Sequence, residues 1–201
     1  MLEKTFRALA SARARALLTI GMVLGIGAVT TLAYWTDTAT VNSGTFSSGT
    51  LNLKVDGNEG NPTAYGWSTF NASNLVPGES VAATFQVQNT GTVDFTYTGT
   101  GSASGALAPS LRFTVRTGAT AGNSGAAGSR VGTCTGGTAQ SSSLTYTGTA
   151  QTVAGTAQTV AAGGSQTFCV IATLDAGTAL SEGGKSASAQ FVVTAKQLGA
   201  P

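Results

Sequence analysis

Residues 81–97 read VAATFQVQNTGTVDFTY, and this stretch decides the fold class. Apolar side chains stand at every second position on both sides of the turn residues Asn89-Thr90-Gly91, and mostly polar ones stand between them. A period of two residues is typical of β-strands that bury one face. The stretch therefore predicts two strands joined as a β-hairpin.

The same alternation recurs along the chain after residue 50, without a helical period. It is clearest in the stretches Leu51–Val55, Leu111–Val115, Phe168–Leu174 and Phe191–Ala195. About eight strands, separated by Gly, Ser, Asn or Pro, predict an all-β antiparallel sandwich. Residues 117–165 show the pattern weakly, and we expect long loops around one or two short strands there.

The composition agrees with strands and turns. Of 201 residues 28 are Gly, and only 9% are charged, against about 25% in an average protein. The segment before residue 16 holds four of the ten basic side chains, and a chain that starts at Tyr34 has a net charge of −1. No basic patch therefore indicates nucleic acid or an anionic membrane as a partner.

The N-terminal segment predicts export. Residues 16–33 carry no charge and follow a basic stretch, and they end in the small residues Thr31 and Ala33. This pattern predicts a signal peptide over residues 1–33, cut between Ala33 and Tyr34 by a signal peptidase. The alternative is an uncleaved membrane anchor, since 18 apolar residues approach the length of a transmembrane helix.

The absence of histidine limits the chemistry of this chain. It excludes Ser-His-Asp and Cys-His nucleophiles and histidine-based zinc catalysis. A carboxylate pair would remain possible, but the acidic residues mostly stand at turns such as Asp56-Gly57, Gly78-Glu79 and Asp175-Ala176, where we expect solvated side chains. We therefore expect no catalytic residue, no cofactor and no metal site, with a loose calcium loop at residues 56–59 as the alternative.

Two further sets of residues have structural interpretations. Cys134 and Cys169 are expected to form a disulfide in an exported protein, because two cysteines without histidine cannot complete a zinc site. Tyr65 and Trp67 precede Phe70, and such aromatic residues more often pack in a core than stack on a carbohydrate.

Three motifs follow one another in the first half of the chain. Residues 33–37 read AYWTD directly after the apolar run, and residues 44–53 read GTFSSGTLNL. The third motif reads NLVPGESV at residues 74–81 and leads to FQVQNTG at residues 85–91. In this order and spacing they resemble the TasA/camelysin family, whose signal peptides are processed by the dedicated signal peptidase SipW.

The resemblance implies a secreted subunit with a jelly-roll-like sandwich that assembles into extracellular fibres of the biofilm matrix. In TasA-like fibres the N-terminal segment of one subunit adds as a strand to the next. Here that arm would be residues 34–49, between the signal peptide (1–33) and the sandwich (50–201). Its expected anchors are Tyr34, Trp35, Val41 and Phe46. The alternative is that the arm folds back as the first strand of its own domain.

The same resemblance carries a conflicting expectation about activity. Camelysin is described as a metalloprotease, but this sequence has no HExxH motif and no histidine. We therefore expect a structural protein that self-associates head to tail, not an enzyme. The alternative function is a secreted monomeric adhesin or carbohydrate-binding module of the same fold.

Overall fold

The computed structural model describes residues 12–28 and 37–199. The chain divides into two compact units, Met1–Phe46 and Ser47–Pro201. The second unit contains all eight strands of the described residues, and its hydrophobic core draws on residues 53–195 alone. The second unit therefore has a hydrophobic core of its own.

The described part of the first unit is a helix and a segment without regular secondary structure. Helix α2 spans Ala12–Ala28, and no helix in the described ranges is long and apolar enough to cross a membrane. Residues 37–46 form neither helix nor strand. The predicted cleavage site, Ala33–Tyr34, and the predicted anchors Tyr34 and Trp35 lie outside the described residues.

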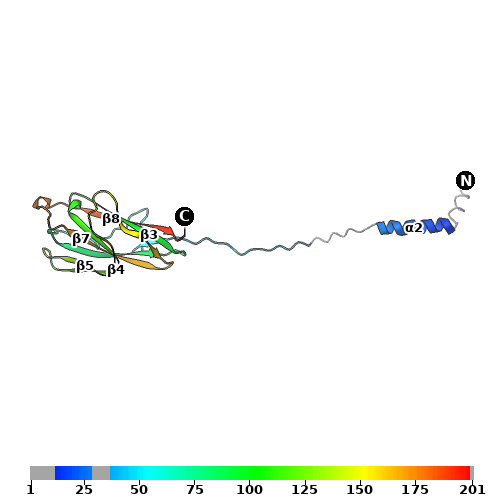
Figure 1. The fold of residues 1–201 in the computed structure, drawn as a ribbon, viewed down its shortest axis with the longest axis horizontal. Helices are drawn as coiled ribbons and strands as arrows, with labels where there is room; N and C mark the ends of the chain where they lie inside the picture. Colours follow the sequence, from blue (N-terminus) through cyan, green and yellow to red (C-terminus); the bar gives the residue numbers. More distant parts are fainter. Residues whose placement is uncertain (1–11, 29–36, 200–201) are drawn as a thin grey trace. The chain divides into compact units, whose positions relative to one another are not determined.

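The second unit is a sandwich of two sheets (Figure 1). One sheet has the strand order β1-β2-β7-β4-β5, and the other has the order β6-β3-β8. All pairings within the two sheets are antiparallel, which confirms the predicted all-β sandwich. The strands are β1 (Leu53–Val55), β2 (Ser80–Asn89), β3 (Phe95–Ser104), β4 (Leu111–Ser124), β5 (Val131–Leu144), β6 (Gln151–Val160), β7 (Ser165–Leu174) and β8 (Ser188–Gln197), with 3-10 turns at Ala108–Ser110 and Leu180–Glu182.

Aromatic side chains from both sheets form the centre of the core. Phe85 of β2 stacks on Phe168 of β7, with ring centroids 5.0 Å apart, and Tyr97 of β3 lies 5.7 Å from Phe168. These three rings are at most 5% exposed. Burial of one such ring stabilises a fold by about 1.5–3 kcal/mol, so the alternation seen in the sequence corresponds to the main stabilising contacts.

The predicted hairpin of residues 81–97 is wrong, because β2 and β3 belong to different sheets. The side chain of Asn89 is 1% exposed and fixes the corner between them. Its Nδ2 donates to the carbonyls of Val93 (2.9 Å) and Val160 (3.1 Å), and its Oδ1 accepts from the N–H of Gly91 (3.0 Å). These bonds replace a tight hairpin turn by a crossing from one sheet to the other.

The expectation of long loops in residues 117–165 is also wrong. Strands β4 and β5 form a hairpin with 14 residues in each strand, and β6 follows it. The hairpin bends where Gly118, Gly136 and Gly137 adopt positive φ angles, which L-residues with a Cβ rarely adopt. We call residues 118–137, beyond this bend, the hairpin tip.

Candidate strand-binding groove

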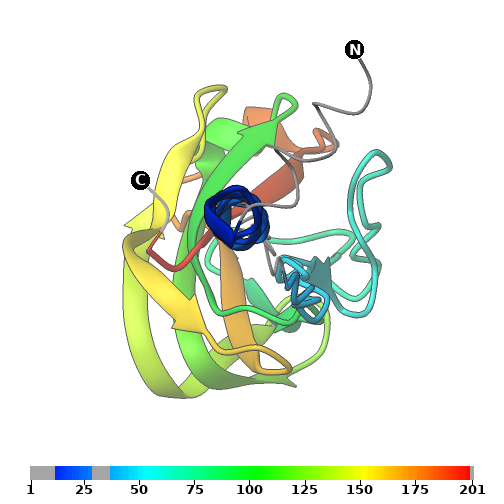
Figure 2. The ribbon, with the colours of Figure 1, turned by 90° about the vertical axis from the view of Figure 1, so that its right-hand side faces the viewer.

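The sandwich is closed along one side and open along the other. On the closed side the edge strands are β5 and β6, and the N–H of Ala103 in β3 donates to the carbonyl of Tyr146 between them at 2.9 Å. On the open side the edge strands are β1, with three residues, and β8, with ten. Figure 2 shows the cyan segment after β1 on the side opposite the yellow-green and yellow strands β5 and β6.

A groove of about 1630 Å³ runs along the open side. Its floor consists of inward-facing apolar residues of both sheets, and the segments 59–77 and 178–187 form much of its rim. The groove exists because β1 is too short to cover β2, so the space between β1 and β8 contains no strand. Among its apolar lining residues are Leu53, Val55, Phe85, Phe113, Leu174, Phe191 and Val193.

Trp67 fills part of this groove. Its ring stacks on Phe70 at 4.4 Å, and the edges of Phe85 and Phe191 lie 5.1 and 6.0 Å from it. Its indole N–H donates to the carbonyl of Thr84 at 3.1 Å. Trp67 is thus engaged by protein contacts on several sides, in line with the packing interpretation of this residue.

Within the residues that the structure describes, the backbone of β8 is the long unpaired edge at the groove. β8 pairs with β3. Leu198, just after β8, donates its N–H to the carbonyl of Asp94, just before β3. In an antiparallel ladder alternate residues point their N–H and C=O groups away from the partner strand. Because Leu198 points its N–H toward β3, the outward residues of β8 are Ala189, Phe191, Val193, Ala195 and Gln197. They offer an incoming strand a row of free main-chain donors and acceptors.

The expectation of a solvated Glu79 is wrong, because its side chain is 3% exposed. Its carboxylate accepts hydrogen bonds from the N–H groups of Gly128 (2.6 Å), Arg130 (2.9 Å) and Val76 (2.9 Å). The N–H of Arg130, followed by that of Val76, holds the pKa of Glu79 below its usual value. The Arg130 guanidinium also donates to the carbonyl of Ser73 at 2.8 Å, so this pair ties the rim of the groove to the hairpin tip.

The predicted disulfide is present. Cys134 of β5 bonds to Cys169 of β7, whose side chain is buried, across a sequence separation of 35 residues. It joins the hairpin tip to the outer face of the larger sheet. The sequence alone predicts the pairing but not that it joins the hairpin tip to the larger sheet.

The predicted arm residues that the structure describes are exposed. The side chain of Val41 is 90% exposed and that of Phe46 is 93% exposed. No strand occurs within residues 37–52, so the alternative of a first strand formed by this arm is not seen there. The sequence predicted the arm but not the open edge of β8, because the alternation in Phe191–Ala195 does not reveal which strands lie at a sheet edge.

The acidic side chains do not gather into a metal centre. Lys54 neutralises Glu59 at 3.3 Å, and Asp56 accepts from the N–H of Gln86 at 2.8 Å. Among the described residues no group of three or more Cys, Asp or Glu side chains could hold a metal ion. With no histidine in the sequence and both cysteines in the disulfide, the available residues do not fit a protease-type zinc site.

Comparison with known proteins confirms the family resemblance for the first half of the chain. Residues 4–99 match the family model described as camelysin metallo-endopeptidase. No curated protein matches the chain. The matched residues include α2, the arm, β1 and β2, whereas β4 to β8 lie beyond them. The family description implies a peptidase metal centre, and the residues of this chain do not fit such a centre.

Proposed function

We propose that the chain is exported and that its sandwich is a structural subunit, which assembles head to tail when residues 34–49 of one copy add as a strand to the groove of the next. The observation that carries the proposal is the apolar groove beside the unpaired edge of β8. An added strand would pair with the outward groups of β8 and cover the apolar floor.

The sequence of the arm suits this role. Residues 35–42 read WTDTATVN, which places Trp35, Ala39 and Val41 on one face of an extended strand, together with Asp37. Thr and Asn occupy the other face, so one face can enter the groove while the other meets water. Phe46 follows Gly44 and would anchor a later part of the arm. At about 3.3 Å per residue, the 16-residue arm reaches roughly 50 Å and exceeds the ten residues of β8.

The exit point of the arm favours an open chain of subunits. The arm joins the sandwich at Gly49, which lies against Val93, and the C-terminal end of β8 lies at the same end of the sandwich. The N-terminal end of β8 and the 178–187 rim lie at the opposite end. A contact between different surfaces of two copies does not close on itself, so it propagates as a filament.

We also propose that this role is non-enzymatic, despite the name of the matching family. The support is the unsuitable ligand set described above. A peptidase assay with and without added Zn²⁺ or a chelator tests this directly. Metal-dependent cleavage of a protein substrate by the purified chain would contradict it.

The proposal can be tested with a single fluorescent reporter. The sequence has two tryptophans, so deletion of residues 34–49 leaves Trp67 in the groove as the only one. A synthetic peptide of residues 34–49 with Trp35→Phe is titrated into this shortened domain. We expect saturable binding that shifts the Trp67 emission, because an added strand changes the surroundings of the indole.

Two matched peptides control for charge. Val41→Asp places a carboxylate on the face expected to enter the groove, and Thr40→Asp places the same charge on the opposite face. The first should abolish binding and the second should weaken it little. Equal effects of both changes, or no binding of the parent peptide, would contradict strand donation.

Filament formation by the whole exported chain is tested by electron microscopy. The chain beginning at Tyr34 should form filaments, and Ala189→Pro should reduce them, because proline removes an outward N–H at an edge where it is tolerated. Monomers under all conditions of salt, pH and concentration would contradict the proposal. Binding of a defined glycan that is lost on Trp67→Ala would favour the carbohydrate-binding alternative instead.

A further inference from the structure

The edge of β2 that faces the groove is occupied by hydrogen bonds from other parts of the chain. β1 covers β2 only at Val87–Asn89, which leaves the edge from Ser80 to Gln86 without a partner strand. Alternate residues along this stretch point their main-chain groups away from β7. These residues are Ser80, Ala82, Thr84 and Gln86.

Each of these four residues has a partner that is not a strand of the same ladder. The N–H of Ser80 donates to the carbonyl of Arg130 at 3.1 Å. Trp67 donates to the carbonyl of Thr84, and Asp56 both accepts from and donates to Gln86. The partner of Ala82 is a side-chain amide from the hairpin tip.

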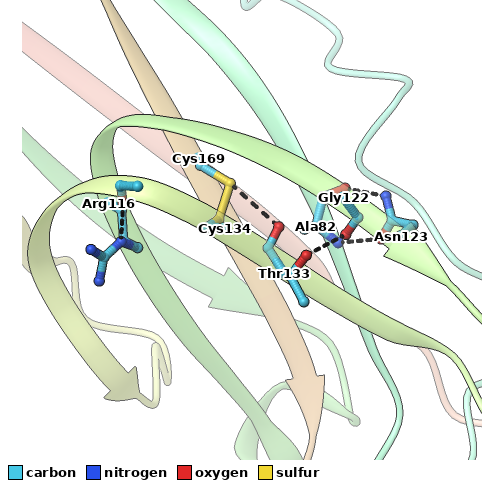
Figure 3. Close-up of a disulfide and its surroundings, with 8 residues drawn as sticks. Ala82, Arg116, Gly122, Asn123, Thr133, Cys134 and Cys169 are labelled. Atoms are coloured by element: carbon cyan, nitrogen blue, oxygen red, sulfur yellow. Dashed lines mark hydrogen bonds between the residues drawn. A yellow bond between two sulfur atoms is a disulfide. The ribbon is translucent and has the colours of Figure 1, made fainter.

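Asn123 takes the place of a strand residue beside Ala82. Its Oδ1 accepts from the Ala82 N–H at 2.8 Å, and its Nδ2 donates to the Ala82 carbonyl at 2.7 Å. Figure 3 shows Asn123 beside Ala82, next to the disulfide that holds the tip. A strand cannot add to β2 at this position while Asn123 occupies both groups.

Besides the bonds from Gly128 and Arg130 to Glu79, three contacts hold the hairpin tip in place. Arg116 donates to the carbonyls of Gly136 (2.7 Å) and Gly137 (2.8 Å) at the bend, and the Cys134–Cys169 disulfide joins the tip to β7. Gly132 packs so closely that an added Cβ would lie 2.5 Å from the Ala82 nitrogen. The tip is therefore fastened across the edge of β2 by covalent and close-packed contacts.

We propose that the disulfide-fastened hairpin tip is a guard, which blocks strand addition to β2 at Ser80 and Ala82 and, together with Trp67 and Asp56 at Thr84 and Gln86, leaves β8 as the one acceptor edge at the groove for the arm of a second copy. β8 provides the contrast, because in the described part of the chain it pairs with β3 alone. The guard gives the groove a single acceptor edge, so one groove accepts one arm and does not become a branch point. This inference rests on the proposed strand donation.

The contact of Asn123 with Ala82 is tested by hydrogen exchange on the chain that begins at Tyr34. In Asn123→Ala, which keeps the disulfide, the amide of Ala82 should exchange roughly five- to tenfold faster, as expected for the loss of one hydrogen bond. The amides of Val81 and Ala83, which face β7, should not change. Ser124→Ala, at the neighbouring position, is the matched control. An unchanged Ala82 amide in Asn123→Ala would overturn the proposal.

The guard function is tested by stoichiometry. The arm peptide should bind once to the shortened domain and gain a second, weaker site in its variant Asn123→Ala/Cys134→Ser/Cys169→Ser, because the main-chain groups of Ala82 are then uncovered, provided that circular dichroism shows that the variant is folded. One site in the folded variant would overturn the guard. If the variant does not fold, Asn123→Ala alone is used, and a second, weaker site supports the guard whereas a single site overturns it.

The two proposals fail in different ways. If the arm peptide binds neither protein, strand donation is wrong, and the guard is then judged by sedimentation of the shortened proteins without peptide. Self-association of the folded variant through its uncovered β2 edge, with a monomeric parent, would support the guard. Monomers in both would overturn it as well.

Discussion

The Glu79 carboxylate accepts a hydrogen bond from the Arg130 main chain at 2.9 Å, while the Arg130 guanidinium lies 3.8 Å from the same carboxylate. This pair joins two segments that are 51 residues apart in sequence. The carboxylate also accepts from the N–H of Val76 on the rim of the groove, whereas Arg130 belongs to the hairpin tip. One buried negative charge therefore connects this part of the rim to the tip.

Acid should loosen this connection. The pKa of Glu79 is lowered from 4.5 in the folded state, so the unfolded chain binds a proton at a higher pH than the folded chain. The stabilisation is complete above about pH 4.5 and is lost as the pH falls through the lower, folded-state pKa. Urea denaturation between pH 3 and 7 should show a smaller acid-induced loss in Glu79→Gln than in the parent. Glu182→Gln, in an exposed pair with Lys185, should behave like the parent.

Removal of the disulfide should destabilise the domain. The bond closes a loop with a sequence separation of 35 residues, and for a loop of this size the chain-entropy model gives about 3–4 kcal/mol. Cys134→Ser/Cys169→Ser should lower the free energy of unfolding by roughly this amount in urea titrations. An unchanged midpoint and slope of the urea transition would show that the unfolded chain gains little conformational entropy when the disulfide is removed.

Asn89→Ala should disrupt the corner between the sheets. The substitution leaves the buried carbonyl of Val160, the partly buried carbonyl of Val93 and the N–H of Gly91 without their partner, at a cost of about 1–3 kcal/mol. Asn71→Ala, at an exposed position, is the control and should cost little. Equal thermal midpoints for both variants would mean that water satisfies the corner equally well.

Gly101→Ala should overpack the core. A Cβ at this position would lie 2.9 Å from Cε2 of Tyr146 and 3.0 Å from Cγ1 of Val153. We expect a loss of about 1–3 kcal/mol in chemical denaturation. Gly66→Ala, which meets no atom within 4 Å, should leave stability nearly unchanged. Similar stabilities of the two variants would show that the Tyr146 ring moves aside at little cost.

The alternation of apolar residues predicted the sandwich because burial of one sheet face constrains every second residue. It could not predict which strands are neighbours. Val81–Val87 and Val93–Tyr97 are consecutive and alternate in the same way, yet the buried amide of Asn89 sends them to different sheets. A one-letter pattern shows a polar residue at a turn and does not show that its side chain is buried.

The weak pattern of residues 117–165 has a different cause. β5 is mostly exposed and consists largely of Gly, Thr and Ser, so neither of its faces carries an apolar series. Its strand conformation follows from pairing with β4 and from the disulfide, both of which are contacts with distant residues. The same limit applies to the groove, whose open edge depends on the length of β1 and not on any motif.

The two ends of the sandwich sequence lie close together. Gly49 lies against Val93, and the N–H of Leu198 donates to the carbonyl of the adjacent Asp94 at 3.0 Å. A short linker could therefore join the ends, and a new start could be placed in an exposed turn elsewhere. Such a circular permutant would keep both sheets while the position of the arm becomes a free choice. Under the proposed strand donation, the direction and spacing of the assembled material could then be set by genetic design.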